Sequence, residues 1–75
     1  MTQPLCNLPT GTHGTVQQIN GEHRFALRAA ALGFTVGTEV LVIHNYGRGP
    51  VMIGVRGARL ALGRGEAFQI QVETE

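Results

Sequence analysis

The side chains of this chain that could take part in chemistry are few and scattered. Cys6, His13, His23 and His44 are the only soft or borderline candidate ligands for a transition metal. Compact metal sites usually draw such ligands from positions a few residues apart, and these four match no such spacing. The sequence therefore predicts no dedicated metal site, and any metal binding through the histidines is expected to be weak and adventitious.

The usual catalytic groups are missing as well. The chain contains no Ser, Lys or Asp, and Cys6 lies in the entry segment without a helix start to activate it as a nucleophile. Residues 47–50 read Gly-Arg-Gly-Pro and lack the Lys and Ser/Thr of a phosphate-binding loop. We therefore expect no enzyme activity and no cofactor.

The composition also argues against two classes of binding partner, nucleic acids and proline-rich peptides. The 6 basic and 5 acidic residues give a net charge of +1, too balanced for a nucleic-acid-binding surface. With no Trp and 1 Tyr, the chain cannot build an aromatic groove for proline-rich peptides. A lone Cys and the lack of a membrane span or signal peptide predict a cytoplasmic protein that reaches a membrane only through a partner.

The elements that position these residues are short. Residues 14–19 favour a first strand, and residues 21–32 a helix, with Asn20 as N-cap, Glu22 at the positive end of the helix dipole and Gly33 as terminator. Phe25, Ala29 and Leu32 would form the apolar stripe of this helix.

Further strands are expected over residues 40–43, 51–55, 58–62 and 68–72, with a loop at 46–50 and with Gly54 marking a bulge or a close approach of another backbone. Five short strands with glycine-rich turns predict a mainly β fold, a small bent barrel with one inserted helix, as one domain over residues 1–75. The periodic apolar positions predict the core: Val16, Phe25, Leu32, Val40, Val42, Ile53, Val55, Leu62, Ile70 and Val72.

The order of motifs resembles the FeoA family of bacterial ferrous iron uptake. The similarity runs through Leu8-Pro9, Leu32-Gly33-Phe34, Gly49-Pro50 and the segment 60–72. It implies an SH3-like barrel and an accessory or regulatory role toward a partner, the membrane transporter FeoB with its cytosolic G-domain. The chain departs from the family pattern at Ala29, at Val36 and at Arg48-Gly49, which places any acidic loop contact in doubt.

Two alternatives stay open at this stage. One is a barrel module like the C-terminal domain of metal-dependent transcriptional repressors, although the chain lacks a DNA-binding helical region. The other is a homo-oligomeric scaffold. For a partner-binding surface we expect the helix and nearby loops to contribute arginines and aromatic residues, the types that anchor interfaces, against the plain reading of an ordinary solvated face. These are Arg24, Arg28, Phe34, Tyr46 and Arg48.

Overall fold

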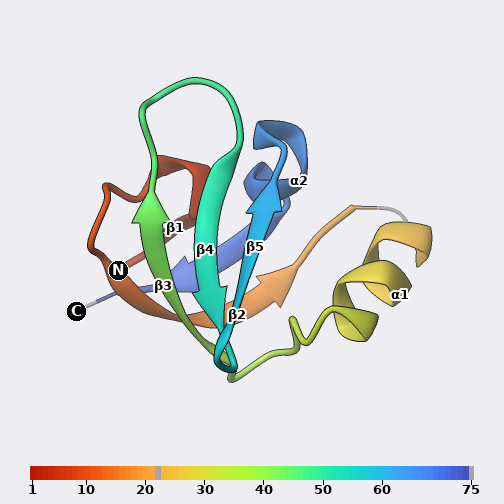
Figure 1. Ribbon diagram of the computed structural model, residues 1–75. Coiled ribbons are helices and arrows are strands. Elements are labelled where there is room, and N and C mark those ends of the chain that lie inside the picture. The colour runs from red at the N-terminus through yellow and green to blue at the C-terminus, as the bar shows by residue number, and fades with distance from the viewer. Residues whose placement is uncertain (22, 75) are drawn as a thin grey trace.

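The computed structural model describes residues 1–21 and 23–74, without the side chain of His23, and is mainly β (Figure 1). In chain order the elements are β1 (Thr2–Pro4), η1 (Leu5–Asn7), β2 (His13–Ile19), α1 (His23–Ala31), β3 (Glu39–His44), β4 (Val51–Val55), β5 (Ala58–Leu62), α2 (Arg64–Phe68) and β6 (Ile70–Glu73).

All six strands join one antiparallel sheet in the order β1-β6-β2-β3-β4-β5. The sheet curls around its own apolar face, as in a barrel, but β1 and β5 remain its two edges and do not pair with each other (Figure 1). The 3-10 helix η1 packs against α2 and β6. Neither α1 nor α2 has the length and apolar character needed to cross a bilayer, and no other described helix does.

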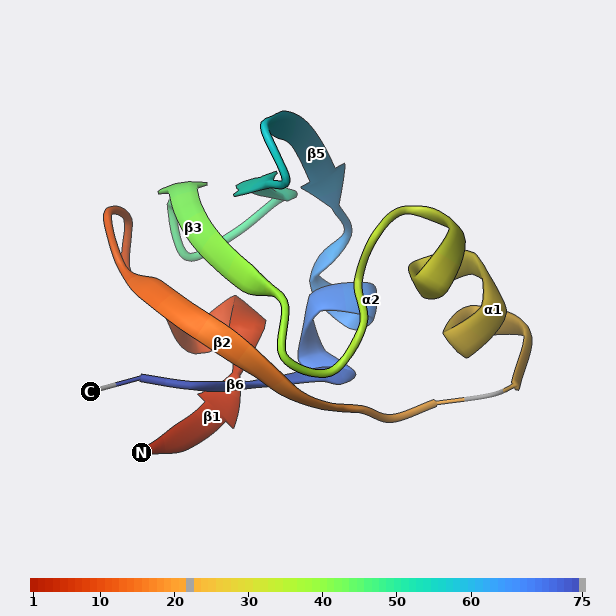
Figure 2. The same cartoon turned by 90° about the horizontal axis from the view of Figure 1, so that it is seen from below.

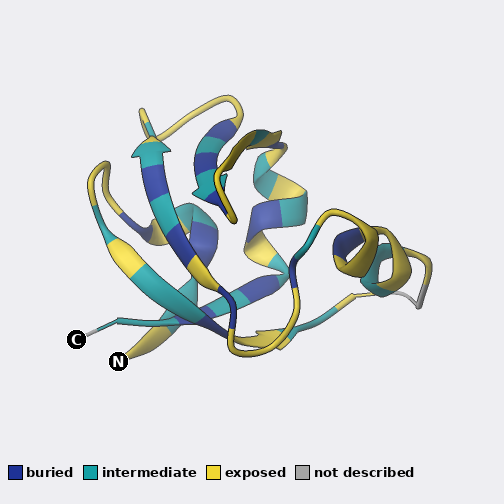
Figure 3. Cartoon of the chain, turned by 60° about the horizontal axis from the view of Figure 1, so that its bottom comes forward, coloured by how far each residue is buried: buried dark blue, intermediate teal, exposed yellow. Residues whose placement is uncertain are grey.

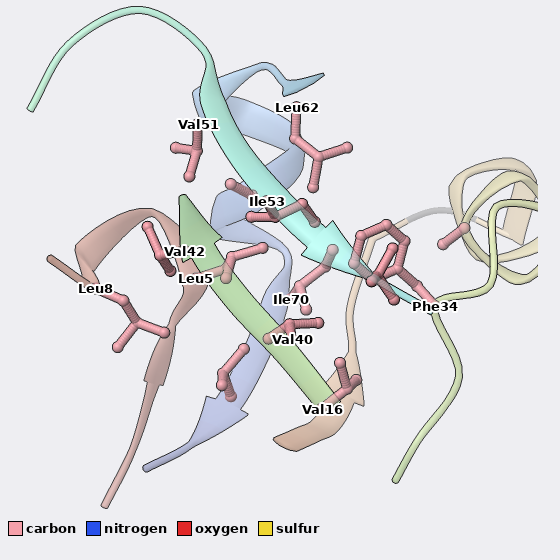
Figure 4. Close-up of a cluster of buried hydrophobic side chains, with 14 residues drawn as sticks. Leu5, Leu8, Val16, Phe34, Val40, Val42, Val51, Ile53, Leu62 and Ile70 are labelled. Atoms are coloured by element: carbon pink, nitrogen blue, oxygen red, sulfur yellow. The ribbon is translucent and has the colours of Figure 1, made fainter. Parts of the chain in front are cut away.

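The core lies inside the curl of the sheet, where alternate strand residues point inward (Figure 4). Strand β4 shows the alternation most clearly, because its first, third and fifth residues are buried and the two between them are not. The expected core positions on the strands are confirmed. The full buried set is Leu5, Leu8, Val16, Ala29, Phe34, Val40, Val42, Val51, Ile53, Val55, Leu62, Ala67, Ile70 and Val72.

The sheet bends at two bulges. On β2 the pairing with β6 shifts between Val16 and Gln18, and on β3 the pairing with β4 shifts between Val42 and His44. A bulge adds one residue to one strand, which bends it and increases its twist. The irregularity expected at Gly54 therefore lies in the neighbouring strand β3, and Gly54 itself keeps regular pairs with Leu41 and Arg59.

The five-strand expectation was one strand short. The chain start was interpreted as an entry segment, but β1 pairs with β6 through Thr2–Glu73, Gln3–Val72 and Pro4–Gln71. A three-residue strand is too short to show an alternating pattern, so the sequence alone could not identify β1 or its pairing with β6. The Met1 ammonium and the Thr2 hydroxyl both donate to the Glu73 carboxylate, and these hydrogen bonds lower its pKa.

A second helix was also missed. Phe68 was expected to begin the last strand, but it ends α2 and is largely exposed. The backbone N–H of Gly63 donates to the Glu66 carboxylate at 3.3 Å, which satisfies a free donor at the helix start. Because glycines lie on both sides of Arg64, the sequence predicted a turn where this short helix begins.

Helix α1 begins at His23 and ends at Ala31, slightly inside the expected range. Its expected acidic first-turn residue, Glu22, and the expected capping interaction of Asn20 lie outside the described residues. The Asn20 side-chain oxygen accepts a hydrogen bond from the Gln18 side-chain amide at 2.8 Å. At the other end the predicted terminator is confirmed, since Gly33 adopts a φ of 97°.

That helix end decides which apolar side chain enters the core. The N–H of Phe34 donates to the Ala29 carbonyl at 2.8 Å, and the N–H of Gly33 to the Ala30 carbonyl at 3.0 Å. This is a Schellman motif, in which the residue after the left-handed glycine folds back onto the helix. Phe34 is consequently 1% exposed, whereas Leu32, expected in the core, is 40% exposed.

Candidate partner-binding surface

Helix α1 stands beside the barrel as a separate arm (Figures 1 and 2). Of its described side chains only Ala29 is buried, while Phe25 and Ala26 are half-buried. Figure 3 shows the contrast, because most of α1 carries the colour of exposed residues and the strands alternate. We call α1 and the segment that follows it, residues 23–37, the α1 arm.

Two charged side chains connect the α1 arm to the barrel. The Arg28 guanidinium forms an ion pair with the Glu66 carboxylate on α2. From the turn between β4 and β5, the Arg56 Nε lies 3.4 Å from the carbonyl oxygen of Gly33. This carbonyl ends α1, where the helix dipole favours a positive charge. These polar contacts add to the burial of Ala29 and of Phe34, which fixes the end of the arm in the core.

The α1 arm exposes large apolar side chains. Leu27 is 59% exposed and Val36 is 67% exposed, and the misassigned Leu32 lies between them in sequence. A single exposed leucine is ordinary, but several on one small element are typical of a contact surface. The sequence offered a signal for Leu27, which lies off the apolar stripe of the helix, but gave no measure of how far Val36 protrudes.

The predicted arginine row is on this arm, but its members differ. Arg24 is exposed and makes no side-chain hydrogen bond or ion pair to any described residue, so it remains available to a partner. Arg28, which was expected to be equally available, already has Glu66 as a neighbour.

The structure separates the five residues expected to form one surface. Phe34 lies in the core and cannot reach a partner. Tyr46 and Arg48 are exposed, but they lie in the β3–β4 loop, away from α1 in both ribbon views (Figures 1 and 2). The ring of Tyr46 stacks on His44 with centroids 5.4 Å apart, and its hydroxyl lies 3.1 Å from His44 Nδ1.

A polar network under that loop was not predicted. The Asn45 amide donates to the carbonyls of Cys6 at 2.9 Å and Leu8 at 2.7 Å, and its oxygen accepts from Arg64 Nη2 at 3.0 Å. Arg64 also donates to the Cys6 carbonyl at 2.8 Å and the Gly49 carbonyl at 3.1 Å. The network fixes the loop that presents Tyr46. Nothing in the local sequence distinguishes Asn45 from an ordinary loop residue.

Candidate metal ligands remain scattered in three dimensions. His13 and His44 are exposed, Cys6 is half-buried against the core, and the side chain of His23 lies outside the described residues. Among the described residues, no group of three or more His, Cys, Asp or Glu is arranged to hold a metal ion.

A curled antiparallel sheet with a helix inserted between β2 and β3 defines the class: this is a mainly β, SH3-like domain. The model of the FeoA domain family matches residues 3–74. A protein of Methanocaldococcus jannaschii named as an Fe(2+) transport protein A is 34% identical over 70 residues, which cover 93% of this chain and 84% of that protein. The chain therefore belongs to the FeoA family.

Solved structures agree with this family. A crystal structure of an iron uptake regulatory protein, FeoA, superposes with a TM-score of 0.94 and 32% identity, covering 100% of both chains. The zinc complex of Stenotrophomonas maltophilia FeoA, described as a prokaryotic SH3 domain protein, has a TM-score of 0.82 and 32% identity, covering 97% of this chain and 89% of that one.

The repressor alternative shares the fold only. A manganese-dependent transcriptional repressor superposes with a TM-score of 0.90 at 21% identity, and the match covers 99% of this chain but 42% of the repressor. The similarity confirms that such repressors contain a domain of this shape.

Proposed function

We propose that this chain is an accessory protein of ferrous iron uptake that acts by binding the cytosolic G-domain of a FeoB-type membrane transporter. Family membership supplies the link to ferrous iron transport. The S. maltophilia relative is described as a candidate activating factor of that transport, which supports a regulatory role carried out through contact with another protein. Such a role requires no catalytic group on this chain, and we expect it to have none.

The observation that carries this proposal is the exposed apolar surface of the α1 arm. Leu27 on the helix and Val36 after it are largely exposed, and Arg24, one turn before Leu27, has no partner among the described residues. Apolar and arginine side chains together are typical of interface anchors. Tyr46 and Arg48 form a second, separate contact area on the fixed β3–β4 loop, which the transporter reaches only if its interface is large.

Calorimetric titration of the full chain against the cytosolic G-domain tests the proposal. Leu27→Asp should weaken binding by about tenfold or more, because loss of a central interface side chain is worth at least ~1.4 kcal/mol. Gln17→Glu on β2 is the matched control, since it also lowers the net charge by one at an exposed position. Wild-type protein that shows no binding would refute the proposal, and Leu27→Asp that binds like wild type would move the interface off the α1 arm.

The loop is tested in parallel with Tyr46→Ala. This substitution removes the ring stacked on His44 and leaves the Asn45 network in place. A binding loss smaller than that of Leu27→Asp is expected if the loop lies at the rim of the interface.

A further inference from the structure

Two strand glycines differ in what the fold requires of them. At Gly14 a Cβ atom would lie 2.3 Å from Val72 Cγ1, so packing inside the barrel excludes a side chain there. At Gly54 a Cβ would meet its nearest neighbour, Ile43 Cδ1, at 3.4 Å, an ordinary contact distance, and the φ angle is not positive. Nothing within the fold accounts for glycine at the centre of β4, where it weakens a strand.

The missing side chain leaves a hollow on the outer side of the sheet. Gly54 lies between Leu41 on β3 and Arg59 on β5, directly opposite each in the pairing. The hollow has a volume of about 440 Å³ and is lined by side chains or backbone of Leu41, Ile43, Val55 and the β4–β5 turn. We call it the Gly54 groove. Its floor is half-buried and aliphatic, so it offers an apolar seat that this chain does not fill.

Arginines form the rim of the Gly54 groove. Arg56 and Arg59 both line it, both are exposed, and neither forms an ion pair with a described residue. Beyond the groove β5 is an edge of the sheet, so no further strand covers this side. An aliphatic floor beside two guanidinium groups that have no carboxylate partner among the described residues is complementary to an aliphatic side chain flanked by carboxylates.

The groove is continuous with the α1 arm. Arg56 lines the groove and also approaches the Gly33 carbonyl at the end of α1 at 3.4 Å. A partner bound along the arm would therefore meet the groove at Arg56 without crossing another element.

We propose that the Gly54 groove binds an extended, carboxylate-bearing aliphatic segment of the partner protein, with an aliphatic side chain over Gly54 and a carboxylate at Arg59. This inference rests on the proposed function in that it assigns the segment to the partner that contacts the α1 arm. Its chemistry is tested independently of that partner by a short peptide.

The decisive variant is Gly54→Val, which fills the groove with a side chain that suits a strand. Gly54→Ala should be at least as stable as wild type, because a Cβ at this position meets its nearest atom at 3.4 Å, and it separates the need for a glycine from the bulk of the valine methyl groups. Arg59→Gln removes the carboxylate partner and lowers the net charge by one, as does the control Gln17→Glu. If Gly54→Ala is itself destabilised, glycine is needed by the fold and the case for the groove is overturned, while Arg59→Gln still measures the charge contact.

The first measurement titrates the full chain with the peptide acetyl-Glu-Leu-Glu-Leu-Glu-amide and follows backbone amide shifts by NMR. The shifted amides should cluster at Gly54 and Arg59. Arg59→Gln should lower the affinity for the peptide about tenfold, and Gly54→Val should abolish the shifts. The same peptide with lysines in place of glutamates should not bind. Equal binding of both peptides, or shifts confined to other surfaces, would overturn the proposal.

The second measurement repeats the titration with the cytosolic G-domain of the transporter. Loss of binding with Gly54→Val but not with Gln17→Glu supports both proposals. If Gly54→Val binds the G-domain as wild type does, the proposal for the groove is refuted and the proposed function stands. If the G-domain binds neither wild type nor any variant, the proposed function is refuted, and the peptide titration alone decides whether the groove binds its segment. A dimer in sedimentation that Gly54→Val dissociates would show that a second copy fills the groove, against this proposal.

Discussion

The barrel and the α1 arm are stabilised by different means. In the barrel, whole side chains such as Ile53 and Val42 are removed from water, and each such burial contributes about 1.5–3 kcal/mol. The helical part of the α1 arm buries only Ala29 among its described side chains and contacts the barrel through Arg28, while Phe34, just after the helix, anchors the end of the arm in the core. The helix of the arm can therefore exchange its surface contacts for those of a partner, while the buried Phe34 keeps the end of the arm attached to the barrel.

The largest expected effect comes from the residue at which arm and barrel meet. Phe34→Ala should lower the free energy of unfolding by about 3–5 kcal/mol, because it empties a fully buried site. A domain of this length is stable by roughly 4–11 kcal/mol, so the variant should be near its limit at room temperature. Urea unfolding monitored by circular dichroism measures the change.

Leu32→Ala is the matched control for that substitution. Leu32 lies two residues away and was expected in the core, but it is 40% exposed, so truncation should cost less than about 1 kcal/mol. Equal losses for the two variants would contradict the Schellman geometry that places Phe34 inside. A large loss for Leu32→Ala alone would restore the expectation that the helix packs through this residue.

This pair also shows how far the sequence could predict the fold. Strand cores such as Val51–Val55 follow a period of two and were identified correctly. At the end of α1 the helical period predicted that Leu32 is buried. The chain reverses at the left-handed Gly33, and a periodic pattern does not account for this reversal, which buries Phe34 in place of Leu32. The missed elements, strand β1 and helix α2, are too short to show a period.

The candidate site was less predictable for a different reason. Exposed arginines and aromatic residues were recognised by type, but their grouping depends on distances between elements far apart in sequence. Tyr46 lies in the β3–β4 loop and Arg24 on α1, and these two elements lie apart in Figure 1. The only sign of the Gly54 groove in the sequence was a glycine within a strand, because the residues that line the groove come from three different strands.

The second prediction concerns the polar network of Asn45 and Arg64 under the β3–β4 loop. Asn45→Ala removes the amide donor to the Cys6 and Leu8 carbonyls and the oxygen that accepts from Arg64. Leaving these partners unsatisfied should reduce the free energy of unfolding by about 1–3 kcal/mol. Thermal unfolding measures this, with Tyr46→Ala as a control that alters the same loop without touching the network. An unchanged midpoint would show that the loop is held by other contacts.

The smallest expected effect tests the link between the two regions. In a double-mutant cycle, Arg28→Ala and Glu66→Gln should show a coupling of about 0.2–1 kcal/mol, as is usual for an ion pair with one exposed partner. Glu66→Gln removes the charge but keeps an amide oxygen able to accept from the Gly63 N–H, so the helix cap is largely preserved.

Hydrogen exchange of the α1 amides provides a readout that global unfolding does not. Removing Arg28 should accelerate exchange in α1 while leaving strand amides unchanged, because the arm opens locally before the barrel unfolds. Raising the salt concentration from about 0.1 to 1 M, which shortens the screening length from ~10 to ~3 Å, should reproduce part of this acceleration in the wild type and none in the variant. A coupling above about 2 kcal/mol, or exchange that accelerates equally in arm and barrel, would mean that the two regions unfold as one unit, and the α1 arm could not then reorganise on its own when a partner binds.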